Sequence, residues 1–276
     1  MKRKIITVAA VFAVLSGFLY CNNNCLMVNS HTVSPKNLPE EFDGFRIVQL
    51  SDLHNKNYRG RLAEKVKGLN PDIIVITGDI IDFYHTKTQV SVDFVESIRS
   101  VAPIYYVTGN HESRLSVYPE FRKDIQNLGV TVLENENVFI EHNGEEICLT
   151  GVDDASFFGS SVLGERERAF SQMLDELKAA SRGKTSILLS HRPEYFDLYV
   201  SAGYSLVFSG HAHGGQIRLP FAGGIFSPGQ GLLPEYAEGI HEKNETKMIV
   251  SRGLGNSVFP FRIFNRPEII VCDLKK

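Results

Sequence analysis

The sequence predicts an α/β protein in which two mixed β-sheets pack together and helices cover their outer faces. This four-layer α-β-β-α sandwich is expected to follow an N-terminal apolar anchor. Three observations support the prediction: apolar strand-like runs alternate with amphipathic helical segments at first, consecutive strand-like runs stand in the middle, and β-structure closes the chain. With 276 residues and 43% hydrophobic residues, the chain can form a substantial core.

Residues 1–28 are typical of a signal peptide or a signal anchor. Lys2-Arg3-Lys4 precedes a charge-free apolar run at residues 5–20. This run would form a helix only about 24 Å long, so a bilayer-spanning helix would also need residues 21–28. No small-residue cleavage site follows the run, which favours an uncleaved anchor in the cell membrane with the rest of the chain extracytoplasmic. If the segment is cleaved, the protein is secreted.

Residues 29–41 are polar and contain two prolines, so we expect them to be a linker. The globular domain is then expected to cover residues 42–276. In its first part, helical periodicity at 61–69, 90–100 and 118–128 alternates with apolar strand-like runs at 45–50, 72–76 and 104–107. This alternation is typical of β-α units with parallel strands.

The middle of the domain departs from that alternation. Three strands are expected in succession as a β meander, at 130–133, 138–141 and 146–152. The remaining elements are expected to be helices at 165–180 and 194–201, with strands at 186–189, 205–208, 216–219, 247–251 and 268–273. These segments supply the second sheet and its covering helices.

Five strand-like runs end in a short polar signature that contains Asp, Asn or His. The carboxyl ends of strands in open α/β sheets meet at one edge, where ligands bind, so these ends are expected to converge. Several signatures contain a glycine, as expected where the backbone turns sharply or is closely approached. The signatures are Ser51-Asp52-Leu53-His54, Gly78-Asp79-Ile80-Ile81-Asp82, Gly109-Asn110-His111-Glu112, Ser190-His191-Arg192 and Gly210-His211-Ala212-His213.

The side chains of these signatures are suited to metal binding. His211 and His213 lie two residues apart, so on a strand end they would project to the same side. Carboxylates, an amide oxygen and imidazoles together favour Mn, Fe or Zn over Ca. The donors are too many for one tetrahedral ion, so we expect two divalent metal ions.

The ordered signatures resemble those of calcineurin-like metallophosphoesterases, with the pattern D-x-H, G-D-x-x-D, G-N-H-[DE], H and G-H-x-H over residues 52–213. The N-terminal apolar segment and Gly214-Gly215-Gln216 resemble the small membrane-anchored bacterial subgroup of that family. The resemblance implies the metallophosphoesterase sandwich and hydrolysis of a phosphoester by a metal-bridging hydroxide. It also implies the metal ligands: Asp52, His54 and His213 for one ion, Asn110, His191 and His211 for the other, and Asp79 as the bridge.

The resemblance further implies two catalytic side chains. His111 would protonate the leaving group, and Asp82 would orient His111. The Arg-Gly that phosphoprotein phosphatases carry after G-D-x-x-D is replaced by Phe83-Tyr84, which argues against a protein phosphatase.

The expected activity is that of a phosphodiesterase on the outer side of the cell membrane. One alternative is a pyrophosphatase of a lipid-linked or acylated sugar nucleotide of the UDP-diacylglucosamine type, which the resemblance suggests. Apolar loops at 156–159, 221–226 and 258–261 bear on this alternative, because they either anchor in the core or form an exposed apolar patch.

A non-enzymatic envelope binding module is a further alternative, disfavoured because no ligand of the pattern is missing. The formal net charge of −3 and the absence of a basic run beyond Lys2-Arg3-Lys4 give no signal for nucleic-acid binding. The expected partners are therefore a phosphate-ester substrate, with a lipid-linked one as the alternative, and the membrane through the N-terminal segment. No oligomeric state is predicted.

Overall fold

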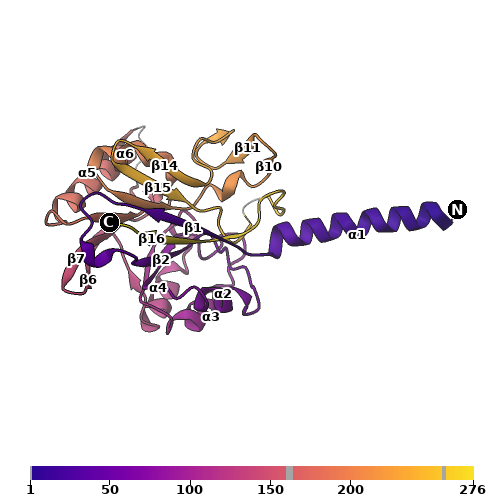
Figure 1. Ribbon diagram of the computed structural model, residues 1–276, viewed down its shortest axis with the longest axis horizontal. Helices are drawn as coiled ribbons and strands as arrows, with labels where there is room; N and C mark the ends of the chain where they lie inside the picture. The colour runs from indigo at the N-terminus through magenta and orange to yellow at the C-terminus, as the bar shows by residue number, and fades with distance from the viewer. Residues whose placement is uncertain (1, 160–163, 257–258) are drawn as a thin grey trace.

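The computed structural model describes residues 2–159, 164–256 and 259–276, so Val258 of the third apolar loop lies outside the described residues. Two six-stranded sheets pack face to face with helices on their outer sides, which confirms the expected fold class (Figure 1). The N-terminal helix α1 (Lys2–Asn24) projects away from this body.

The first sheet has the strand order β1-β16-β2-β3-β4-β5. Strands β2 to β5 run parallel, β16 is antiparallel to β2, and β1 pairs in parallel with β16 at the edge. The bounds of its strands are Met27–Val33 (β1), Arg46–Leu50 (β2), Ile73–Thr77 (β3), Ile104–Val107 (β4), Thr131–Val132 (β5) and Glu268–Leu274 (β16).

Helices α2 (Arg61–Lys67), α3 (Gln89–Ile98) and α4 (Tyr118–Asn127) cover the outer face of the first sheet (Figure 1). Side chains alternate along each strand: Val48 and Leu50 pack under the helices, whereas Ile47 next to Val48 points toward the other sheet. The continuous apolar runs of the sequence therefore reflect strands that are covered on both faces.

The second sheet has the order β14-β15-β9-β8-β7-β6, with β15, β9, β8 and β7 parallel and antiparallel partners at each edge. Helices α5 (Glu165–Ala179) and α6 (Phe196–Ala202) cover its outer face through a separate apolar cluster. The strand bounds are Glu136–His142 (β6), Glu145–Gly151 (β7), Ser186–Leu189 (β8), Leu206–Ser209 (β9), Gly239–Lys243 (β14) and Thr246–Val250 (β15).

The inner faces of both sheets share one apolar cluster, to which Val75 and Ile270 contribute from the first sheet and Ile187 and Phe208 from the second. Short elements complete the fold. They are the two-residue strands β10 (Arg218–Leu219), β11 (Gly223–Gly224), β12 (Phe226–Ser227) and β13 (Gly231–Leu232), and the 3₁₀ turns η1 (Glu40–Phe42), η2 (Glu112–Arg114), η3 (Ala155–Phe157), η4 (Pro193–Tyr195) and η5 (His213–Gly215).

The predicted meander is wrong. Strand β5 pairs in parallel with β4 and ends the first sheet, whereas β6 and β7 form a hairpin in the second sheet. Helix α4 lies between β4 and β5, so the chain completes one more β-α-β crossover before it changes sheets. The three strand-like runs are consecutive in the sequence but belong to two different layers.

The predicted linker at residues 29–41 is also wrong in part. Residues 27–33 form the edge strand β1, which pairs along its whole length with β16. Val33 and Leu38 are buried between the sheets. An edge strand is held by backbone hydrogen bonds and needs few apolar side chains. Most residues of β1 are polar, so the sequence does not show the pattern of a strand there.

Candidate metal centre

Five strand ends converge where the two sheets meet. Strands β2, β3 and β4 of the first sheet and β8 and β9 of the second each end just before one of the polar signatures. All the candidate residues are buried although all are polar: Asp52, His54, Asp79, Asp82, Asn110, His111, His191, His211 and His213. Such a concentration of buried polar groups needs partners to offset its desolvation.

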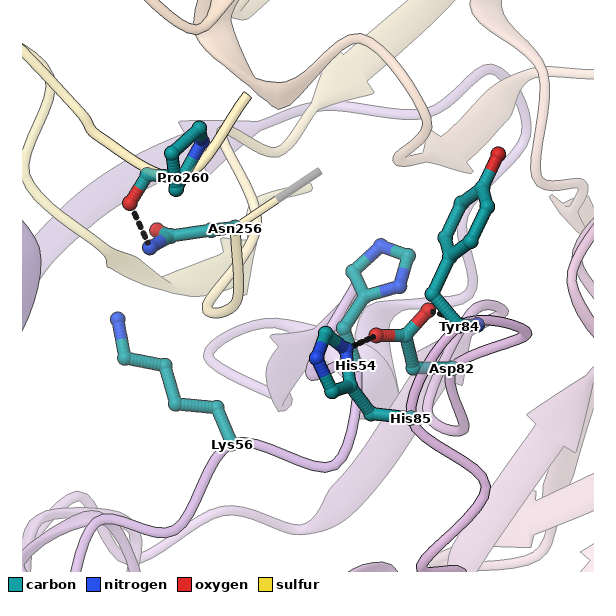
Figure 2. A pocket seen from close by; sticks show the side chains of 7 residues that line it. All are labelled: His54, Lys56, Asp82, Tyr84, His85, Asn256 and Pro260. Carbon is teal, nitrogen blue, oxygen red and sulfur yellow. Dashed lines mark hydrogen bonds and ion pairs between the residues drawn. The ribbon is translucent and has the colours of Figure 1, made fainter. Parts of the chain in front are cut away.

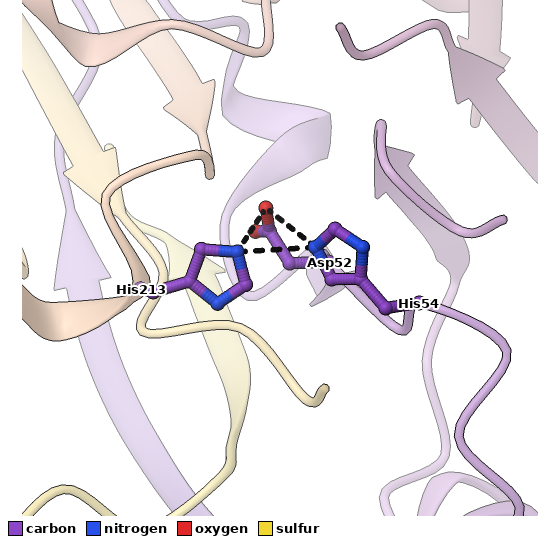
Figure 3. Close-up of side chains that lie close together, drawn as sticks. All are labelled: Asp52, His54 and His213. Carbon is purple, nitrogen blue, oxygen red and sulfur yellow. Dashed lines mark hydrogen bonds and ion pairs between the residues drawn. The ribbon is translucent and has the colours of Figure 1, made fainter. Parts of the chain in front are cut away.

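The first group of possible ligands consists of Asp52, His54 and His213 (Figure 3). The Nε2 atoms of the two imidazoles are 3.1 Å apart. The Oδ1 atom of Asp52 is 3.4 Å from Nε2 of His213 and 4.0 Å from Nε2 of His54. Two ring nitrogens and a carboxylate oxygen therefore surround one point, as ligands of a single cation do.

The second group consists of Asp79, His191 and His211. The Nε2 atom of His191 is 3.2 Å from Oδ2 of Asp79 and 3.1 Å from Nδ1 of His211. On its other side, Nδ1 of His191 donates to the backbone carbonyl of Thr77 at 2.8 Å, which leaves Nε2 free to bind a cation. Oδ2 of Asp79 also lies 3.8 Å from Nε2 of His54, so Asp79 contacts both groups.

Unpaired polar atoms in the site fit a bound cation. Within the described part of the chain, the Oδ1 atom of Asn110 is buried and has no hydrogen-bond partner. An amide oxygen can only accept, so a cation would satisfy it. The donors present thus fit divalent metals: carboxylate and amide oxygens together with imidazole nitrogens.

The electrostatics of the site agree with cation binding. Burial lowers the pKa of His54 to about 4 and holds the pKa of His213 well below its usual range, so both rings are neutral, the form that binds metals. Burial opposes protonation of His191, but Asp79 outweighs it and raises the pKa of His191 to about 10. The carboxylate of Asp79 thus favours a positive charge at this position.

The backbone of the site is unusual. Asp52, His54, Asp79, His211 and His213 all have φ between 49° and 64°. Residues other than glycine rarely adopt this left-handed backbone conformation, and those that do are often found at functional sites. The strand ends therefore turn sharply so that consecutive signatures aim their side chains at one another.

Two glycines permit this close approach. A side chain at Gly109 would collide with the carboxylate of Asp79, and a side chain at Gly210 would collide with that of Asp52. The expected role of these glycines is thus confirmed.

His111 lies next to the second group and, with His54 and Asp79, makes a third set of side chains close enough together to hold a cation. Its Nδ1 atom accepts a hydrogen bond from the backbone N–H of Phe83 at 3.0 Å and lies 3.2 Å from Oδ1 of Asp82. In the neutral ring the proton is therefore on Nε2, which is 3.9 Å from Oδ2 of Asp79. Burial opposes protonation, but Asp79 and Asp82 outweigh it and raise the pKa of His111. The ring is oriented to donate a proton into the site.

The sequence did not reveal the role of Glu112. Its buried carboxylate accepts hydrogen bonds from the backbone N–H groups of Asp79 at 3.0 Å and Gly109 at 2.7 Å, so it ties together the loops after β3 and β4. Glu112 occupies the last position of G-N-H-[DE], and this position alone does not indicate which groups its carboxylate binds.

Two residues near the C-terminus of the chain hold His213 in place. The side-chain amide of Asn265 donates to the carbonyl of His213 at 2.7 Å. The buried guanidinium of Arg262 lies 3.3 Å from Nδ1 of His213 and donates to the carbonyl of Gly255 at 2.9 Å. No motif surrounds these residues in the sequence, so sequence reasoning had no signal for them.

Two cavities adjoin the site. One of about 230 Å³ is lined by Asp79, Asn110 and His111 together with Arg114 and Arg192. The guanidinium of Arg192 is held by Asp154 through two hydrogen bonds, of 2.7 and 3.1 Å. Charged arginines beside the ligand groups suit a phosphate.

The second cavity, of about 410 Å³, lies beside His54 (Figure 2). Tyr84 and Asp82 form one side of it, and Asn256 and Pro260 form the opposite side. Tyr84 also lines the smaller cavity, so the two are neighbours.

Comparison with known proteins gives the family. The model of the calcineurin-like phosphoesterase family matches residues 45–215. The chain is 32% identical over 266 residues to the uncharacterized metallophosphoesterase YkuE of Bacillus subtilis, covering 93% of this chain and 88% of that protein. It is 29% identical to the transmembrane protein with metallophosphoesterase domain of Danio rerio, covering 87% of this chain and 55% of the relative, just over half of its length.

Among solved structures, the NAD nucleotidase of Haemophilus influenzae shares the fold with a TM-score of 0.51 at 14% sequence identity, over 76% of this chain and 45% of that one. The family match covers more than half of the chain and contains the strand ends that carry the site. The chain therefore belongs to the calcineurin-like phosphoesterases and is a metal-dependent phosphoesterase.

Proposed function

We propose that this protein is a phosphodiesterase with two divalent metal ions. Asp52, His54 and His213 would hold the first ion. Asn110, His191 and His211 would hold the second, and Asp79 would be shared by both. The observation that carries the proposal is the position of Asp79, whose Oδ2 atom lies 3.2 Å from His191 and 3.8 Å from His54. One carboxylate thus reaches both ligand groups.

The ions are proposed to be Mn, Fe or Zn, because the donors mix imidazole nitrogens with carboxylate and amide oxygens. When bound, two such ions make a water molecule acidic enough to act as a nucleophile and offset the charge of the phosphoryl group. The neutral amide of Asn110 adds no further negative charge near an anionic substrate.

His111 is proposed as the general acid. In the protonated ring, Nε2 faces the site and would donate the proton, while the carboxylate of Asp82, 3.2 Å from Nδ1, stabilises this charged form. Arg114 and Arg192 line the same cavity and are placed to bind phosphoryl oxygens. The chain's own residues therefore bind the phosphate, orient it and supply the leaving-group proton.

We further propose that the protein is a single-pass membrane protein with its catalytic domain extracytoplasmic. Among the described residues, one helix, Arg3–Asn24, is long and apolar enough to cross a membrane. Basic residues precede the apolar run, which favours a cytoplasmic N-terminus. A reporter fused after Lys276 should behave as extracytoplasmic, and a cytoplasmic reporter signal would overturn this orientation.

A second candidate activity is hydrolysis of the pyrophosphate of an acylated sugar nucleotide. It is favoured by the cavity of about 410 Å³ beside His54, which offers room for a large group next to the metal centre. In that case the acylated part of the substrate would occupy this cavity.

The experiment is an assay of the full-length protein with added Mn, Fe or Zn. Its substrates are a soluble phosphodiester, a phosphomonoester and a diacylated sugar nucleotide in detergent micelles. We expect metal-dependent turnover with the diester preferred over the monoester. Preference for the acylated nucleotide would select the second candidate, and absence of turnover on all three would contradict both.

A further inference from the structure

The end of helix α1 is fixed to the globular body. Arg266 donates to the carbonyl of Cys25 at 2.9 Å, Arg61 donates to the carbonyl of Asn24 at 3.4 Å, and Lys56 donates to the carbonyl of Asn23. The last carbonyls of a helix have no partners within it, so Lys56 and Arg61 satisfy those of Asn23 and Asn24, and Arg266 binds the carbonyl just beyond the helix. The direction of α1 relative to the body is therefore defined.

Two asparagines of the last turn extend this joint. The backbone N–H of Asn265 donates to Oδ1 of Asn22 at 3.1 Å, and the backbone N–H of Arg262 donates to Oδ1 of Asn23 at 3.0 Å. The amide of Asn23 donates back to the carbonyl of Arg262 at 3.3 Å. Residues 262–265 thus lie directly against the end of the apolar helix.

One contact sets the depth of this segment along the helix. The rings of Phe18 and Phe264 meet edge to face with centroids 5.0 Å apart. At 1.5 Å per residue, Phe18 lies about 9 Å along the axis from the end of α1 at Asn24. The side chain of Phe264 therefore reaches past the polar last turn to the level of the apolar part of the helix.

The same segment exposes large apolar side chains. Phe259, Phe261 and Phe264 are 47%, 51% and 53% exposed. The side-chain amide of Gln216 donates to the carbonyls of Phe259 at 2.9 Å and Phe261 at 3.2 Å, which holds the backbone of the segment in place. The segment lies on the side of the body from which α1 departs (Figure 1). An exposed aromatic cluster on that side is typical of a surface that contacts a membrane.

We propose that Phe259, Phe261 and Phe264 insert into the bilayer that α1 crosses. The inference rests on the proposed membrane anchoring by α1. A bilayer around the apolar part of α1 extends laterally past Phe264, because that ring lies at the depth of Phe18. Pro260, between two of these aromatics, lines the cavity of about 410 Å³ (Figure 2), so the cavity beside the metal centre opens close to the membrane surface.

The chain contains no tryptophan, which makes a single introduced tryptophan an unambiguous probe. Three full-length variants are compared in vesicles of phosphatidylcholine and phosphatidylglycerol, with and without brominated acyl chains: Phe261→Trp in the aromatic segment, Phe12→Trp within α1, and Ile240→Trp as the control. Ile240 is a matched control because it is 41% exposed on the edge strand β14. Bromine quenches tryptophan only on contact, so quenching reports insertion.

We expect Phe12→Trp and Phe261→Trp to lose fluorescence in brominated vesicles and Ile240→Trp to keep it. Quenching of Phe12→Trp without quenching of Phe261→Trp would overturn the inference and leave the anchor intact. If the Phe261→Trp variant stays unquenched and also emits at short wavelength, protein rather than lipid covers the segment, and the inference again fails. Absence of quenching at Phe12→Trp as well would refute both the anchor and the inserted segment.

Discussion

The metal centre and the joint between α1 and the body are both polar, yet they are built in opposite ways. In the metal centre, side chains point at one another and leave buried atoms such as Oδ1 of Asn110 without a protein partner. In the joint, side chains such as those of Asn23 and Arg266 hydrogen-bond to backbone groups. The centre thus offers a cation several side-chain donors at one point, whereas the joint is formed mainly by hydrogen bonds between side chains and backbone groups.

The largest expected effect comes from removing the charge that both ligand groups share. Asp79→Asn should lower turnover by about 10³-fold or more. In other enzymes, removing a single group that stabilises charge in the transition state lowers the rate by a comparable factor. The protein should still fold, because asparagine keeps the oxygen that accepts from the N–H of His111 at 2.8 Å. Turnover with the saturating metal ion and the free energy of unfolding are the two measurements.

The matched control is Asp197→Asn, which alters an exposed carboxylate on α6 that pairs with Lys243. This variant should keep wild-type turnover. If Asp79→Asn also kept it, the shared bridge would not exist.

The next effect concerns proton donation. His111→Ala should lower turnover of esters with poor leaving groups by about 10² to 10⁴, the usual value of general acid catalysis. Activated nitrophenyl esters need little protonation and should be affected far less. Metal content should be unchanged, since His111 is assigned no ligand role. An equal loss on both kinds of ester would show that His111 does not act by protonation.

The smallest effect is expected in the joint. Asn23→Ala removes hydrogen bonds to Arg262 and should lower the free energy of unfolding by about 1–3 kcal/mol. Asn24→Ala is the control, because the Asn24 amide bonds to the carbonyl of Tyr20 within the same helix. It should change stability by less than about 0.5 kcal/mol. Equal effects of the two changes would mean that the joint is not formed in solution.

These two regions also differ in how far the sequence predicts them. Each ligand pair follows a strand within a few residues, so Asp52 with His54, or His211 with His213, carries a local signal. Parallel strands then bring the signals to one edge, which is why the fold class and the grouping of the candidate residues could be predicted. The ligand roles themselves stay a prediction.

The joint and the edge strand β1 carried no such signal. Many of their contacts run from side chains to backbone, or from backbone to backbone, between residues far apart in the sequence, as between Asn23 and Arg262. Backbone groups are the same in every residue, so the sequence does not show which ones pair. For that reason the sequence does not distinguish β1 from a linker, and it gives no signal for the contacts of Arg262 and Asn265 with His213.

We propose that one site holds two ions through the shared carboxylate of Asp79. The most direct test is the metal content of the purified full-length protein, measured together with anomalous scattering from its crystals. We expect two metal ions per chain, one beside His54 and His213, the other beside His191 and His211, with Asp79 between them. One ion per chain with full turnover, or ions elsewhere in the protein, would contradict it.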